Sequence, residues 1–186
     1  MGGAQAADWI ADVLCFWFEE LKPAQWFTKD AELDEFILKR FLTVHERVAA
    51  AAEGELLADA RTALAAMIVL DQFSRNMFRG SARAFATDAK ALALADKAIA
   101  RGFDMLLSTN ERVFLYLPFE HSENRVMQAR SVALFQALGD PKQMRYAEAH
   151  KAIIDRFGRF PHRNAILGRT STAAEEAFLK EPGSRF

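Results

Sequence analysis

The helical fold is clearest in residues 87–102, which read TDAKALALADKAIARG. Thr87 and Asp88 supply an N-cap and an acidic first turn, where the free backbone N–H groups of a helix favour such side chains. Arg101 and Gly102 supply a basic last turn and a C-terminal glycine. The stretch therefore predicts one helix with both of its ends marked.

The same end signals recur along the rest of the chain. N-cap residues mark further predicted helix starts at Asp8, Asp30, Ser108, Ser122, Asp140 and Thr172. We expect the helix after Asp8 to end near Glu20 and the helix after Asp30 to end near Glu53. Strand signals are essentially absent. The pattern predicts an all-α fold of about eight helices with no sheet, in which short turns join antiparallel helical hairpins.

Length and composition favour one core. The chain has 186 residues, of which 51% are hydrophobic, and a core of that size suits an ordinary single domain. We predict a single α-helical domain over residues 1–186, with residues 1–6 and a few residues at the C-terminus flexible.

Charge and hydropathy exclude two classes of partner. The 24 basic and 25 acidic residues are interspersed and give a net charge of -1, which does not attract nucleic acid. The longest apolar run, residues 63–70, is far shorter than the roughly 20 residues of a membrane-spanning helix. The single cysteine, Cys15, cannot form an internal disulfide, and the N-terminus has no targeting pattern. We predict a cytoplasmic protein that binds neither nucleic acid nor membrane.

Three motifs place polar side chains between aromatic residues at the ends of apolar helices: Leu70–Asn76, Pro118–Glu123 and Phe157–Asn164. In the first motif, helical spacing carries an inward apolar stripe onward to Asp71 and Arg75. Similar spacing directs Glu120, His121 and His150 inward. Buried polar groups are costly unless they pair with one another or with a ligand. We therefore expect the three motifs to converge on one polar pocket.

The residue types in this pocket suggest its chemistry. Arginines are fork-shaped donors for a carboxylate or phosphate, and a histidine oriented by a carboxylate can transfer a proton near neutral pH. The catalytic candidates are His121, His150, His162, Asp71 and Glu123. The ligand-binding candidates are Gln72, Arg75, Asn76, Arg79, Glu120, Arg163 and Asn164. We predict that the pocket binds a small polar or anionic molecule, with turnover left open.

Each of these residues also has an architectural interpretation. Asp71 and Arg75 can form a structural ion pair, and His150 can be a core histidine with satisfied hydrogen bonds. Glu120 and Glu123 flank a helix start, where acidic residues are favourable. A metal site from His121, His150, His162 and a carboxylate is an alternative, but no HExxH motif supports it, and we predict no metal. Glycine-rich phosphate loops are absent, and the sequence does not identify a cofactor.

The aromatic residues offer a competing function. The set Phe16, Trp17, Phe18, Trp26, Phe27, Phe73, Phe78, Phe157 and Phe160 can line a groove for a partner helix or peptide. The protein is then an interaction scaffold with a protein partner, and the polar motifs only lock its helices. Aromatic residues at helical spacing more often belong to a core, which favours the pocket.

Long ordered motifs also carry a family resemblance. They are Val13–Phe18, Trp26–Phe27, Leu70–Asn76 with Phe78–Gly80, Phe85–Asp88, Leu117–Glu123, and Arg156–Asn164 with Leu167–Arg169. They resemble the bacterial family catalogued as domain of unknown function 924. The resemblance implies a helical fold of the tetratricopeptide-like superfamily and no established activity, substrate or cofactor. That family usually has proline where this chain has Ser74, and we expect the helix stop after Phe73 to persist.

Overall fold

The computed structural model describes residues 4–184, and the chain divides into two compact units. The first unit comprises Met1–Arg79 and Arg83–Pro118, and the second comprises Gly80–Ala82 and Phe119–Phe186. No residue from 4 to 184 lies in a β-strand, which confirms the all-α prediction. The predicted single domain and the tetratricopeptide-like stacking stay predictions.

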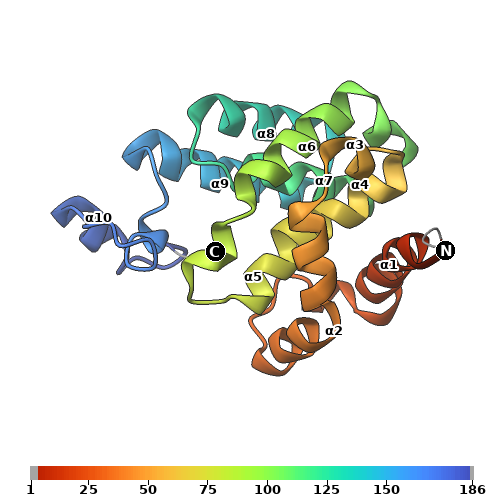
Figure 1. Cartoon of the computed structure of the whole chain (residues 1–186). Coiled ribbons are helices and arrows are strands. Elements are labelled where there is room, and N and C mark those ends of the chain that lie inside the picture. The colour runs from red at the N-terminus through yellow and green to blue at the C-terminus, as the bar shows by residue number, and fades with distance from the viewer. Residues whose placement is uncertain (1–3, 185–186) are drawn as a thin grey trace. The chain divides into compact units, whose positions relative to one another are not determined.

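The elements follow one another with short connections (Figure 1). The first unit contains α1 (Ala4–Cys15), η1 (Phe16–Glu20), η2 (Pro23–Gln25), α2 (Ala31–Ala50), α3 (Glu53–Leu56), α4 (Ala60–Met67), η3 (Ile68–Phe73), α5 (Ser74–Met77), α6 (Asp88–Ala100) and η5 (Phe103–Leu106). Two elements reach both units, η4 (Ala82–Phe85) and α7 (Thr109–Glu120). The second unit continues with α8 (Arg125–Leu138), α9 (Pro141–Phe157), η6 (Pro161–Arg163) and α10 (Ala173–Phe178).

Local capping explains most helix starts. The Asp30 carboxylate accepts hydrogen bonds from the N–H groups of residues 32 and 33, and the Asp140 carboxylate does the same for residues 142 and 143. Thr172 forms a capping box with Glu175. These starts were predicted.

Several predicted helix boundaries are wrong. The first helix begins at Ala4, ahead of Asp8, whereas its predicted end near Glu20 is correct because the π-helical turn η1 continues the helix to Glu20. Helix α2 ends at Ala50 rather than near Glu53. Helix α8 begins after Asn124, not Ser122, because the Asn124 side chain accepts from the next turn's N–H groups. Of the residues predicted to be flexible, 1–3 and 185–186 lie outside the described part of the chain.

A π-helical turn, η3, continues helix α4 directly into the first polar motif. A π turn leaves a backbone carbonyl without its usual helical donor. The carbonyl of Leu70 instead accepts from the Ser74 hydroxyl at 2.8 Å and from the Thr87 hydroxyl at 2.6 Å. Helical structure consequently continues to Met77, so the expected stop after Phe73 is wrong.

Four aromatic residues of the first unit lie in its core. Phe16, Trp17, Phe41 and Phe73 are each at most 2% exposed. The rings of Phe41 and Phe73 lie 4.7 Å apart, and those of Trp17 and Phe73 lie 5.6 Å apart. Because these side chains pack on one another, they are not free to line a binding groove.

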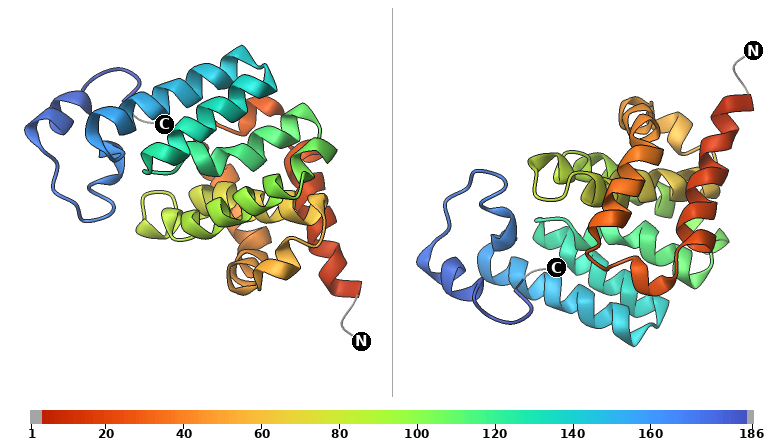
Figure 2. Two further views of the ribbon diagram at one scale, coloured as in Figure 1. Left: turned by 90° about the horizontal axis from the view of Figure 1, so that it is seen from above. Right: turned by 90° about the horizontal axis from the view of Figure 1, so that it is seen from below.

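In the second unit, helices α8 and α9 lie side by side as an antiparallel hairpin (Figure 2). Gly139 joins them with a φ of 77°, a left-handed conformation that favours glycine. The Gln128 side chain of α8 donates from Nε2 to the carbonyls of Glu120 and Ser122, at 2.6 and 2.7 Å. These bonds hold the C-terminal end of α7, where the second polar motif lies.

No helix within residues 4–184 is long and apolar enough to cross a membrane.

Candidate functional site

In the first polar motif, Arg75 bridges two carboxylates. Its guanidinium lies 3.0 Å from the Asp71 carboxylate and makes two 3.0 Å hydrogen bonds to Asp88. Asp71 is 1% exposed, so its charge requires a partner. Burial favours the neutral form of Arg75, but Asp71 and Asp88 outweigh burial and raise the pKa of Arg75. The bridge joins η3 to the first residue of α6.

The other residues of this motif contact carboxylates too. Gln72 donates to Asp71. Asn76 Nδ2 donates to Asp34 Oδ1 at 2.7 Å, and Arg79 Nη2 donates to the same oxygen at 2.8 Å. Asp34 belongs to α2, so these contacts tie α5 to α2. Asn76 and Arg79, both predicted to bind a ligand, are thus hydrogen-bonded to a carboxylate of a neighbouring helix.

A groove of about 390 Å³ also lies in the first unit. Residues of α2 and of the segment after α5 line it: His45, Glu46, Ala49, Ala50, Phe78, Arg83, Ala86 and Thr87. None of the residues predicted for the polar pocket lines this groove, whereas Phe78, one of the aromatic residues predicted to line a partner groove, does.

The second unit brings Glu120, His121 and His150 together. One ligating atom of each side chain lies within 4.8 Å of the ligating atoms of the other two. Glu120 and His150 are 3% and 5% exposed, and His121 is half-buried. The Glu120 carboxylate lies 3.3 Å from Nδ1 of His150. Sequence periodicity had directed these three side chains inward.

The protonation of His150 follows from its contacts. Its Nδ1 lies 2.8 Å from the carbonyl of Tyr146, which can only accept, so Nδ1 carries the hydrogen. Burial, then the charges of His121, Arg163 and His162, lower the pKa of His150 to about 3. The imidazole is therefore neutral near pH 7, and its contact with Glu120 is not an ion pair. Nε2 carries the lone pair.

The Arg163 guanidinium and two imidazoles surround the Phe160 ring. Its ring is fully buried, and the Arg163 guanidinium lies over it at 4.6 Å from the ring centre. The His150 and His162 rings lie 5.6 and 5.7 Å from the Phe160 ring. The His121 ring is 6.2 Å from that of His150. We call Glu120, His121, His150, His162 and Arg163 the histidine cluster.

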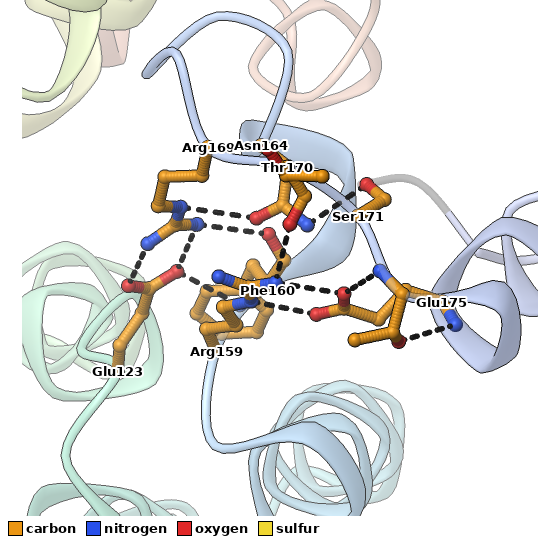
Figure 3. Close-up of polar contacts among 9 residues, drawn as sticks. Glu123, Arg159, Phe160, Asn164, Arg169, Thr170, Ser171 and Glu175 are labelled. Atoms are coloured by element: carbon orange, nitrogen blue, oxygen red, sulfur yellow. Dashed lines mark hydrogen bonds and ion pairs between the residues drawn. The ribbon is translucent and has the colours of Figure 1, made fainter.

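Beside this cluster, Arg169 holds the loop that follows α9 (Figure 3). Its guanidinium donates to both carboxylate oxygens of Glu123, at 2.7 and 2.9 Å, and to the side chain of Asn164 at 3.0 Å. Glu123 also accepts from the backbone N–H of Phe160 at 2.8 Å. Burial would raise the pKa of Glu123, but Arg169 and the Phe160 N–H outweigh it and lower that pKa.

A second arginine fixes the end of the same loop. Arg159 donates to the two carboxylate oxygens of Glu175 at 2.6 and 2.8 Å and to the Thr170 carbonyl (Figure 3). Hydrogen bonding to Arg159 lowers the pKa of Glu175 to about 2, against the burial that would raise it. Together with Arg169, Arg159 forms what we call the loop latch.

Two groups of predicted residues therefore form within the units. Asp71, Gln72 and Arg75 contact one another in the first unit, and Asn76 and Arg79 share Asp34. In the second unit, the histidine cluster assembles, and Glu123 and Asn164 share Arg169. Convergence of the first motif with the other two stays a prediction.

Sequence reasoning missed the roles of three residues that hold segments together within the second unit: Gln128, Arg159 and Arg169. Gln128 and Ser131 lie on the buried face of α8 with Phe135, so a polar interruption of a helical stripe could have flagged Gln128. The two arginines lie in a loop, where no periodicity applies.

Comparison with known proteins identifies the family of the chain. The family model described as "Bacterial protein of unknown function (DUF924)" matches residues 13–183. A solved structure, of the protein of unknown function ATU0120 from Agrobacterium tumefaciens, is 43% identical in sequence and superposes with a TM-score of 0.89. The alignment covers 94% of this chain and 98% of that one. No curated protein matches the chain. The chain belongs to the DUF924 family of bacterial proteins of unknown function.

Proposed function

We propose that the protein binds a small anionic molecule at the histidine cluster. The observation that carries this proposal is the gathering of the buried Arg163 guanidinium and two imidazoles around the Phe160 ring. Arginine presents paired N–H donors that match carboxylate and phosphate oxygens. Glu120 contributes one negative charge to a cluster with one arginine and three histidines.

Electrostatics at His150 support a negative ligand. His121, Arg163 and His162 all act to keep a further proton off this buried imidazole, and they lower its pKa together with burial. Burial is the largest cause of this shift and disfavours charge of either sign, so the support for an anion comes from His121, Arg163 and His162. Phosphate and small carboxylates are anions of this class.

If proton transfer accompanies binding, His121 is the better candidate. An imidazole whose pKa is about 3, as in His150, is a weak base near pH 7. Glu123 is held by Arg169 and by the Phe160 N–H, which suits a positioning role. The half-buried His121 is the histidine of the Glu120 group that solvent reaches best.

Calorimetric titration of the full chain with inorganic phosphate tests the proposal. Saturable binding to the wild type, lost in Arg163→Gln, is expected because glutamine keeps polarity but removes the charged fork. Arg125→Gln is the matched control, since Arg125 is exposed and donates to the Asp155 carbonyl. Equal phosphate binding by wild type and Arg163→Gln would overturn the proposal.

A further inference from the structure

Glu120, His121 and His150 offer the donor set of a transition-metal site. Two imidazole nitrogens and one carboxylate are common ligands of Zn²⁺ and of other first-row divalent ions. Their ligating atoms lie within 4.8 Å of one another. Ligands around a tetrahedral Zn²⁺ are separated by about 3.3 Å, given bonds of about 2.0–2.1 Å. Side-chain adjustments of at most about 1.5 Å would bring the group to that separation.

The surroundings of His150 match those of a metal ligand. Metal-binding histidines nearly always donate their second ring N–H to a carbonyl or carboxylate, which fixes the tautomer. Nδ1 of His150 donates to the Tyr146 carbonyl at 2.8 Å. With the hydrogen on Nδ1, the nitrogen that can coordinate a metal is Nε2.

The backbone that carries the other two ligands is also held. Gln128 donates to the carbonyls of Glu120 and Ser122, which flank His121. Gln128 is fully buried, and it fixes these carbonyls from a neighbouring helix. Preorganised supports of this kind reduce the cost of gathering ligands around an ion.

We propose that Glu120, His121 and His150 bind one divalent transition-metal ion and leave a coordination position for the anionic ligand. The inference deepens the proposed function, because it names a cation in the same site. Arg163 and His162 oppose a bare cation, whereas an anion shared between the metal and Arg163 offsets that repulsion. Metal and anion should therefore each strengthen binding of the other, by the same factor.

Cobalt titration of the metal-stripped full chain tests this inference. Co²⁺ reports its coordination through visible absorption, and Zn²⁺ should displace it. We expect one equivalent to bind the wild type, and binding to weaken at least tenfold in His121→Ala and in Glu120→Gln. His45→Gln is the matched control, because His45 is a buried histidine of the first unit that contacts Ser74 at 2.8 Å. Thermal unfolding of each variant verifies that it is folded.

The outcomes separate the two proposals. Absence of saturable Co²⁺ binding, or equal binding by wild type and His121→Ala, would overturn the metal site. Sulfate binding to the metal-free protein would in that case still support the anion site. Conversely, Co²⁺ binding that sulfate does not strengthen, in a protein that binds no phosphate with or without metal, would support the metal site and refute the anion site.

Discussion

The arginines of the first polar motif and the arginine of the histidine cluster have different surroundings. Arg75 and Arg79 are held by carboxylates of neighbouring helices, Asp88 and Asp34. Arg163 packs over an aromatic ring beside two imidazoles. The first arrangement matches charge with charge and fastens helices. The second gathers an arginine and two imidazoles around one ring, and an external anion is the ligand that we propose for it.

The difference shows that a polar residue on an apolar helix face can be interpreted in two ways, as a structural residue or as a candidate binding residue. Asp71 and His150 are both buried and both were expected to face inward. Asp71 meets a guanidinium at 3.0 Å, whereas His150 is neutral beside Glu120 and His121. Under the proposed function, the type of partner separates residues that fasten helices from residues that bind a ligand.

The largest expected effect comes from breaking the Arg75 bridge. Arg75→Ala leaves the Asp71 carboxylate buried without its guanidinium, which costs about 3–5 kcal/mol for a buried pair. Urea unfolding should show a lower midpoint at an unchanged slope. Lys39→Ala is the control, because its pair with Glu35 is exposed on both sides and is worth under ~1 kcal/mol. A loss of stability no larger than that control would contradict a fastening role for Arg75.

A smaller effect is expected at the loop latch. Arg169→Met removes the hydrogen bonds that Arg169 donates to Glu123 and Asn164, and it should lower the free energy of unfolding by about 1–3 kcal/mol. Hydrogen exchange should increase in residues 158–172, with little change in α8. Arg125→Met serves as the matched control in the same unit. Unchanged exchange in this loop would show that Arg169 does not hold it.

The pH dependence of the latch provides a further test. Because Arg159 lowers the pKa of Glu175 from its ordinary 4.5 to about 2, the folded state binds this proton less readily than the unfolded state. The contribution is fully present above about pH 4.5 and is lost as the pH falls to about 2. The free energy of unfolding should fall more steeply over this range in the wild type than in Glu175→Gln. Parallel pH profiles would contradict the pairing.

The smallest stability effect is expected within the histidine cluster. His121→Ala should change the free energy of unfolding by under ~0.5 kcal/mol at neutral pH, since residues placed for binding seldom contribute to stability. Thermal unfolding measures this directly. A destabilisation of about 1–3 kcal/mol would instead mark His121 as a structural hydrogen-bonding residue.

Local chemistry made much of the fold predictable. The starts of α2, α9 and α10 follow from Asp30, Asp140 and Thr172, whose side chains bond to the next turn. The π-helical turns η1 and η3 were not predictable, because their i to i+5 bonds leave no distinct residue pattern. The expected end of the first helix at Glu20 is correct, whereas α2 ends three residues before the expected Glu53, and nothing in the local sequence marks that end strongly.

The candidate site was predictable only in part. Inward spacing on α7 and α9 identified Glu120 and His150, which do meet. Pairing of Arg169 with Glu123 joins residues far apart in the sequence and depends on the path of a loop, so no local pattern predicts it. The pairing of Asp34 with Arg79 and of Asp88 with Arg75 was not predicted, for the same reason.

The central claim is that the histidine cluster receives an anion, and imidazole resonances test it most directly. The chain has four histidines, three in the cluster and His45 outside it. Nuclear magnetic resonance of the ¹⁵N-labelled protein, titrated with phosphate at constant ionic strength, follows all four at once. The account predicts saturable shifts of His121, His150 and His162 while His45 stays unchanged. Equal shifts of all four, or no shift in the cluster, would contradict it.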